Sequence, residues 1–137
     1  MSRILSIDYG KKRTGIAVTD PLQIIATALT TVETSTFFGF LDNYLKNENV
    51  EEIVIGHPKH TNNKDADIMA EIRIFAQKIN DKYPQIKTVF YDERYTSKMA
   101  ASMMVEAGYK KKDRRKKENL DKISATILLQ DYLQFKN

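Results

Sequence analysis

Three acidic motifs stand at the ends of predicted elements that are far apart in the chain. Asp8 closes a strand-like run that begins at Arg3, Asp92-Glu93-Arg94 closes a later strand, and Asp121 opens a C-terminal apolar helix. Two divalent ions about 3.5 to 4 Å apart can activate a water and stabilise the leaving oxygen of a phosphodiester, and carboxylates hold such ions. The pattern of Asp8, Glu93 and Asp121 therefore predicts a metal-dependent hydrolase.

Basic residues accompany the acidic motifs. The segment from Lys110 to Lys117 carries seven basic residues and one acidic residue, whereas the rest of the chain carries 15 basic and 17 acidic residues. A run of this kind is often a solvated loop, but its place directly before the helix of Asp121 favours binding of a polyanion, with an affinity that falls as salt rises. The predicted nucleic-acid-binding residues are Lys11, Lys12, Arg13, Arg94, Lys110, Lys111, Lys112, Arg114, Arg115, Lys116 and Lys117.

Composition limits the class of protein and the kind of metal. A chain of 137 residues with 42% hydrophobic residues is expected to form one domain, residues 1–137. It has no cysteine, which excludes thiolate ligands and favours hard cations such as Mg²⁺ or Mn²⁺ on oxygen ligands. No run of 18 apolar residues could span a bilayer, and Met1 leads directly into a strand pattern, so we expect a soluble, cytoplasmic protein without a membrane partner.

The pattern of apolar residues and turns predicts an alternation of strands and helices. Three strands, Arg3 to Asp8, Gly15 to Asp20 and Ile24 to Val32, are joined by short turns and should form an antiparallel meander. Two further strands, Glu52 to Gly56 and Lys87 to Asp92, are expected later in the chain. The continuous apolar centre of the fourth strand indicates burial on both faces, as in parallel pairing.

Helical spacing of apolar residues predicts the remaining elements. The expected helices are Thr34 to Lys46, Lys64 to Tyr83, Thr96 to Ala107 and about Asn119 to Phe135. Three meander strands followed by β-α units give an α/β fold: a mixed five-stranded sheet in the order 3-2-1-4-5, with helices on both faces. This order is that of ribonuclease H-like folds.

Four motifs then identify a family. The segments IDYGKKRTGIAVTD at 7–20, VIGHP at 54–58, DERYTS at 92–97 and LDKISATILLQDYL at 120–133 resemble the YqgF/RuvX family over nearly the whole chain. Members are similar in fold to the Holliday-junction resolvase RuvC and are described as resolvases or as nucleases that trim the 5′ end of precursor 16S ribosomal RNA.

The resemblance implies a site and a substrate. It assigns the catalytic and metal-binding acids to Asp8, Glu93 and Asp121, and the arginines of the first two motifs to Arg13 and Arg94. It implies structured RNA as the partner, with association to a ribosome precursor, and branched DNA as the alternative. The chain departs from the family pattern in the loop from Gly56 to Asn63, and it has Ser124-Ala125 where paired alanines are common.

Each acidic residue also has an alternative explanation. A lone aspartate at a strand end such as Asp8 is often a turn former, and Asp121 could interact with the dipole at a helix N-terminus. Strand 5 should lie two strands, about 10 Å, from strand 1, so Glu93 would bind a second ion or orient water. Asp92 competes with Glu93, but neighbours on a strand point to opposite faces, and we prefer Glu93.

Other residues remain open between a functional and a structural role. His57 and His60 follow the fourth strand, where a histidine could act as a general acid, although loop histidines are usually only solvated. Tyr9 and Tyr95 could stack on an unpaired base or pack in the core.

Two rival functions belong to other classes. Asp8-Tyr9-Gly10 followed by Thr14-Gly15 looks like the first phosphate loop of actin-like and sugar-kinase-like ATP-binding proteins, but the chain has one copy of the fold and no second phosphate loop. A non-catalytic nucleic-acid-binding module would keep the basic segment without needing three acids. The sequence leaves the cleavage position, the physiological metal and the oligomeric state open, and a resolvase would need a symmetric dimer to cut two strands.

Overall fold

The computed structural model describes residues 2–57, 63–92 and 117–136, which form a five-stranded sheet in the order β3-β2-β1-β4-β5. This confirms the predicted order. The elements are β1 (Arg3–Asp8), β2 (Arg13–Thr19), β3 (Ala26–Glu33), a 3₁₀ turn (Thr34–Thr36), α1 (Phe37–Asn47), β4 (Val50–His57), α2 (Asn63–Lys82), β5 (Lys87–Asp92) and α5 (Lys117–Lys136).

The pairing of the strands is also as predicted. β1, β2 and β3 form an antiparallel meander, whereas β1 pairs with β4 and β4 with β5 in parallel. β1 is therefore the central strand, and its carboxyl end lies at the same edge of the sheet as those of β4 and β5.

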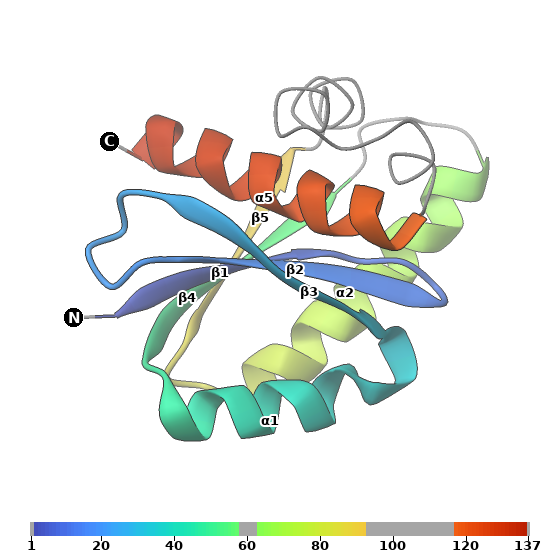
Figure 1. Ribbon diagram of the computed structural model, residues 1–137. Coiled ribbons are helices and arrows are strands. Elements are labelled where there is room, and N and C mark those ends of the chain that lie inside the picture. Colours follow the sequence, from blue (N-terminus) through green and yellow to red (C-terminus); the bar gives the residue numbers. More distant parts are fainter. Residues whose placement is uncertain (1, 58–62, 93–116, 137) are drawn as a thin grey trace.

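Helices cover both faces of the sheet (Figure 1), because the central strands are apolar on both sides. On one face, Leu5 and Ile7 of β1 join a core with residues of α1 and α2. On the other face, Ile4 of β1 and Val54 of β4 pack with residues of α5. Ile72, Phe75 and Ile79 of α2 belong to the first core, and the partly buried Ile68 packs against it.

Some element bounds differ from the predicted ones, and hydrogen bonds explain the larger differences. β3 begins at Ala26 because the carboxylate of Asp20 accepts the backbone N–H groups of Ile24 and Ile25, which keeps both residues in the turn. α1 begins at Phe37, because Thr34 is engaged with the β1–β2 turn. The last helix begins at Lys117, two residues early, since lysine and glutamate favour helix. The helix predicted for Thr96 to Ala107 lies outside the described residues.

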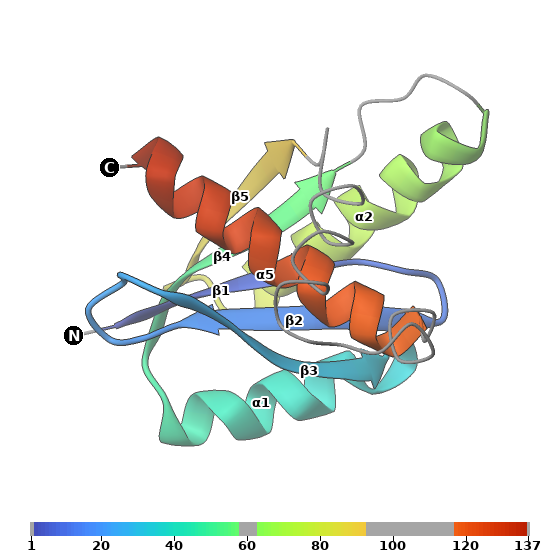
Figure 2. The same ribbon diagram turned by 45° about the horizontal axis from the view of Figure 1, so that its top comes forward.

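α5 lies across the sheet and runs antiparallel to β1 (Figure 2). Near the C-terminus of the helix, Tyr132 and Lys136 bind Glu52, which is paired with Ile4 near the start of β1. Further toward its N-terminus, the carbonyl of Ala125 accepts a 2.6 Å hydrogen bond from the buried hydroxyl of Ser6. Moving toward the N-terminus of α5 therefore means moving toward the carboxyl end of β1.

None of the helices in the described ranges is long and apolar enough to cross a bilayer.

The close approach of α5 to β1 depends on a small residue at position 125, which is fully buried. We expect Ala125→Leu to lower the free energy of unfolding by about 1–3 kcal/mol, because the larger side chain must push the helix away from Ser6. Chemical denaturation measures the change. Ala70→Leu, on an exposed position of α2, is the matched control and should change stability by less than about 0.5 kcal/mol.

Candidate active site

The candidate site is the edge of the sheet where the three parallel strands end, which we call the carboxyl edge. Asp8, His57 and Asp92 are the last residues of β1, β4 and β5. In open α/β sheets, ligands bind beyond the carboxyl ends of the strands. Two of the predicted acidic motifs therefore begin at one edge, as the predicted strand order requires.

Asp8 belongs to the face of the sheet that α5 covers. Side chains alternate along a strand: Ile4 and Ser6 contact α5, whereas Leu5 and Ile7 pack against α1 and α2. Asp8 has the parity of Ile4 and Ser6, and it is half-buried. The central strand thus brings a carboxylate to the carboxyl edge on the side of the last helix.

Asp121 is the fifth residue of α5, four residues before Ala125. Because α5 runs antiparallel to β1, this turn of the helix lies toward the carboxyl edge, on the same face as Asp8. The structure describes the helical backbone at Asp121 and not its side chain.

The basic turn, residues Lys11 to Arg13, is held by backbone carbonyls. The hydroxyl of Thr34 donates to the carbonyl of Gly10 at 2.6 Å, and the N–H of Thr34 donates to the carbonyl of Lys12 at 2.9 Å. Since that hydroxyl proton is used, the 2.8 Å contact with Thr14 must be donated by Thr14. Lys11 and Lys12 remain exposed beside the strand end that carries Asp8.

Tyr9 packs against the core on the face of the sheet that α1 and α2 cover. Its ring lies 4.8 Å from that of Phe75, centroid to centroid, and its hydroxyl donates to Glu71 at 3.4 Å. Burial, followed by the charge of Glu71, raises the pKa of Tyr9, which keeps the phenol neutral. Glu71 also lies 3.8 Å from the Nζ of Lys11. α2 thereby supports the turn that follows Asp8.

Several predicted residues fall outside the described part of the chain: Glu93, Arg94, Tyr95, His60 and Lys110 to Lys116. Lys117 is described only as the first residue of α5. Within the described ranges, no three His, Cys, Asp or Glu side chains are grouped to hold a metal ion. Of the three predicted ligands, only Asp8 has a described side chain, and its oxygens suit Mg²⁺ or Mn²⁺.

Sequence reasoning missed two residues that support this edge, Thr34 and Glu71. Thr34 was expected as the first residue of a helix, and threonine is indeed typical of such positions. Nothing local indicated that it would bind a turn more than 20 residues earlier in the chain. Glu71 has the appearance of a solvent-facing helix residue, and only the tertiary structure brings it to Tyr9 and Lys11.

Comparison with known proteins identifies the family. Residues 2–135 match the model of the family described as "RuvX: Holliday junction resolvase". The chain belongs to the RuvX family. Among curated RuvX relatives, proteins named "Putative pre-16S rRNA nuclease" from Amoebophilus asiaticus and Phocaeicola vulgatus are each 53% identical to it. The alignments cover 97% of this chain and 94% of the first relative, and 99% and 98% for the second.

Solved structures confirm the fold expected for a RuvX chain. RuvC of Thermus thermophilus, solved in complex with a Holliday junction substrate, superposes with a TM-score of 0.63 at 15% sequence identity. The match covers 99% of this chain and 96% of RuvC. The fold is therefore RuvC-like and ribonuclease H-like, as the strand order and the motifs predicted.

Gly10 is the residue on which the geometry of the basic turn depends. A Cβ at position 10 would lie 2.3 Å from the backbone carbonyl oxygen of Arg13, so Gly10→Ala must displace the turn. We expect a loss of about 1–3 kcal/mol in thermal unfolding, together with weaker nucleic-acid binding. Gly39→Ala is the matched control, because a Cβ there meets nothing within 4 Å and alanine should stabilise α1 by roughly 0.5–1 kcal/mol. Equal effects of the two substitutions would contradict this role of Gly10.

Proposed function

We propose that this RuvX chain is a metal-dependent endonuclease that cuts structured RNA and processes the 5′ end of precursor 16S ribosomal RNA. Asp8, Glu93 and Asp121 are its catalytic acids in this proposal. The observation that carries it is the docking of α5 on β1, because this docking brings two chain segments more than 100 residues apart to one edge of the sheet.

The geometry of the docked helix supports a shared role for Asp8 and Asp121. From the contact between Ser6 and Ala125, Asp8 is two residues, about 6.6 Å, along the strand. Asp121 is four residues, about 6 Å, along the helix in the same direction. Positions four apart on a helix share one face, so position 121 continues the face that Ala125 presents to the sheet. Both displacements end at the carboxyl edge.

The alternation of β5 supports Glu93 over Asp92. Val89 and Tyr91 pack with the core under α5, whereas Thr88 and Phe90 line a pocket against α2. Odd-numbered positions of this strand therefore belong to the face of Asp8 and α5, and the proposal continues this alternation one residue beyond Asp92, which assigns Glu93 to the same face. β5 lies two strands from β1, so Glu93 suits a second ion or the orientation of water, as a partner of Asp8 across the site.

Metal dependence follows from the chemistry that the acids can perform. Bound divalent ions would lower the pKa of an attacking water and neutralise the charge on the leaving oxygen. The protein's own part is to hold carboxylates in fixed positions on rigid elements: Asp8 on the central strand and Asp121 on a helix docked onto it. The basic turn and the segment from Lys110 to Lys117 would hold the phosphates of the substrate over this edge.

Two substrates are candidates, and each is supported by a different comparison with known proteins. The curated relatives at 53% identity are named for pre-16S rRNA, which supports RNA. The family description names a Holliday junction resolvase, which supports branched DNA as the alternative. We choose RNA because the relatives match almost end to end at high identity, and because cutting one strand needs no second active site.

Replacing a catalytic acid should abolish cleavage while leaving binding intact. We expect Asp8→Asn and Asp121→Asn each to reduce Mg²⁺- or Mn²⁺-dependent cleavage of a precursor 16S rRNA fragment by a factor of 100 or more, which is on the order of 2.7 kcal/mol in the barrier. The dissociation constant of the same RNA should change little. Asp131→Asn is the matched control on α5, because it lies ten residues from Asp121 and its amide oxygen can still accept from Tyr91.

The same assay with a four-way DNA junction decides between the substrates. Cleavage of the junction alone would replace the RNA proposal by the resolvase alternative. Failure to cut either substrate with any divalent ion would leave a nucleic-acid-binding protein without catalysis.

The exposed lysines of the basic turn should contribute to affinity in proportion to their phosphate contacts. We expect Lys11→Gln and Lys12→Gln to weaken RNA binding at low salt, and each to reduce the slope of log K against log[salt] by about one unit or less. Lys78→Gln, on an exposed position of α2, serves as the control. Unchanged slopes in both turn variants would remove the turn from the RNA-binding surface.

A further inference from the structure

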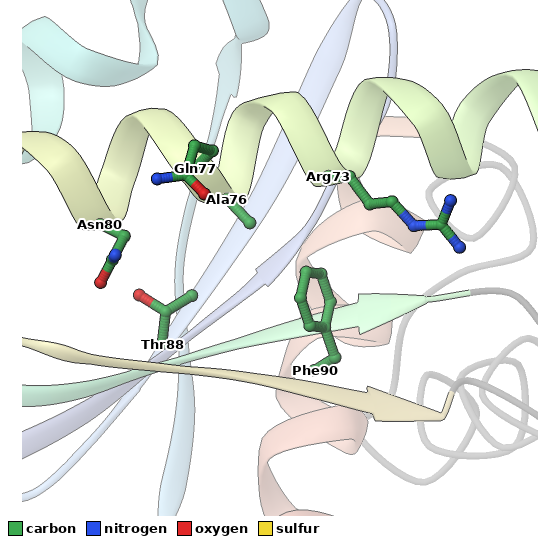
Figure 3. A pocket seen from close by; sticks show the side chains of 6 residues that line it. All are labelled: Arg73, Ala76, Gln77, Asn80, Thr88 and Phe90. Atoms are coloured by element: carbon green, nitrogen blue, oxygen red, sulfur yellow. The ribbon is translucent and has the colours of Figure 1, made fainter.

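We propose that the cavity between α2 and β5 binds one unpaired nucleobase of the RNA substrate, in the part of the strand that passes around β5 from the site of cleavage. The cavity has a volume of about 360 Å³ and is lined by Arg73, Ala76, Gln77, Asn80, Thr88 and Phe90 (Figure 3). This inference rests on the proposed function, and it adds a binding site on the face of the sheet opposite Asp8.

The chemistry of the lining fits a planar, uncharged ring with polar edges. Arg73, Gln77, Asn80 and Thr88 carry groups that can form hydrogen bonds with a ligand, and no carboxylate is among the described lining residues. Arg73 supplies a cation for the phosphate of the bound nucleotide or for stacking on its base. Phe90 exposes 43% of its surface at the mouth and provides an aromatic face for a base.

Two side chains set the direction of the hydrogen bonds. The amide nitrogen of Gln77 donates to Asp81 at 2.8 Å, so its carbonyl oxygen is left on the side of the cavity (Figure 3). This oxygen is an acceptor and selects a base with an exocyclic amino group. The hydroxyl of Thr88 is buried in the wall and has no hydrogen-bond partner among the described residues. A polar group bound in the cavity can supply that partner, whose absence otherwise costs stability.

The position of the cavity relates it to the carboxyl edge. Phe90 is paired with Ile55, which is paired with Ile7, the residue before Asp8. Two strand spacings, about 10 Å, therefore separate Phe90 from β1 in the plane of the sheet. β5 is the last strand of the described sheet, so a single strand of RNA can pass around it from one face to the other.

The test measures RNA binding in the Asp8→Asn background, which separates it from cleavage. Fluorescence of 2-aminopurine, placed in turn at each position of a precursor 16S rRNA 5′ fragment, should be quenched by the protein at one unpaired position. We expect Phe90→Leu to abolish this quenching and to weaken binding roughly 5- to 100-fold. Phe135→Leu removes a phenylalanine that is 75% exposed on α5 and should change neither measurement.

Thr88 gives a second, independent measurement. Thr88→Val should raise the melting temperature, because it removes a buried hydroxyl without a partner, and should weaken binding of the RNA; Thr88→Ser should restore binding. Wild-type affinity and quenching in both Phe90→Leu and Thr88→Val would overturn the proposal. It would equally be overturned if Phe90→Leu converted a dimer to a monomer in sedimentation without changing RNA affinity, since the cavity would then be an interface between two copies.

Failure of the base site is distinguishable from failure of the proposed function. Cleavage of precursor rRNA by the Phe90→Leu variant at the wild-type rate and affinity would remove the cavity and leave the nuclease assignment in place.

Discussion

The hydrogen bond from Ser6 to Ala125 joins the central strand to the last helix, and the candidate site depends on it. Both residues are fully buried, and the bond spans 119 residues of sequence. Its net contribution to stability is only about 0.5–1.5 kcal/mol, but an unpaired hydroxyl at this depth would cost about 1–3 kcal/mol. The bond therefore favours one position of α5 along the direction of β1. That position determines which turn of the helix meets the end of β1.

The opposite end of α5 is held by a different kind of contact. Glu52 is buried to 98% and is bound by the hydroxyl of Tyr132 and the ammonium group of Lys136. A carboxylate at this depth must be compensated by such partners, so the helix cannot leave the sheet without leaving a charge unpaired. Tyr132 in turn has its pKa raised strongly by burial and by Glu52. The hydrogen bond at Ala125 and the contacts of Glu52 with Tyr132 and Lys136 hold α5 at two points. Together they fix both the position and the direction of the helix.

The sequence was sufficient to predict the sheet order and the parallel and antiparallel pairs. These features depend on local periodicity and on topological rules, which a single sequence contains. The roles of Thr34 and Glu71 could not be predicted, because each acts on a segment that is distant in sequence. Tyr9 was left open between stacking and packing, and only the ring of Phe75 decided it. The placement of Glu93 and of the segment from Lys110 to Lys116 stays a prediction.

The way in which the basic turn is held has a consequence for how substrate preference can change. The hydroxyl and the N–H of Thr34 donate hydrogen bonds to the backbone carbonyls of Gly10 and Lys12. These carbonyls are present whatever side chains the turn carries. The ion pair between Lys11 of the turn and Glu71 of α2 is long and exposed, and contributes little to stability. Evolution or protein engineering can therefore exchange the two lysines for other residues without refolding the loop, so the contacts that the turn offers to a substrate can change while its backbone stays in place.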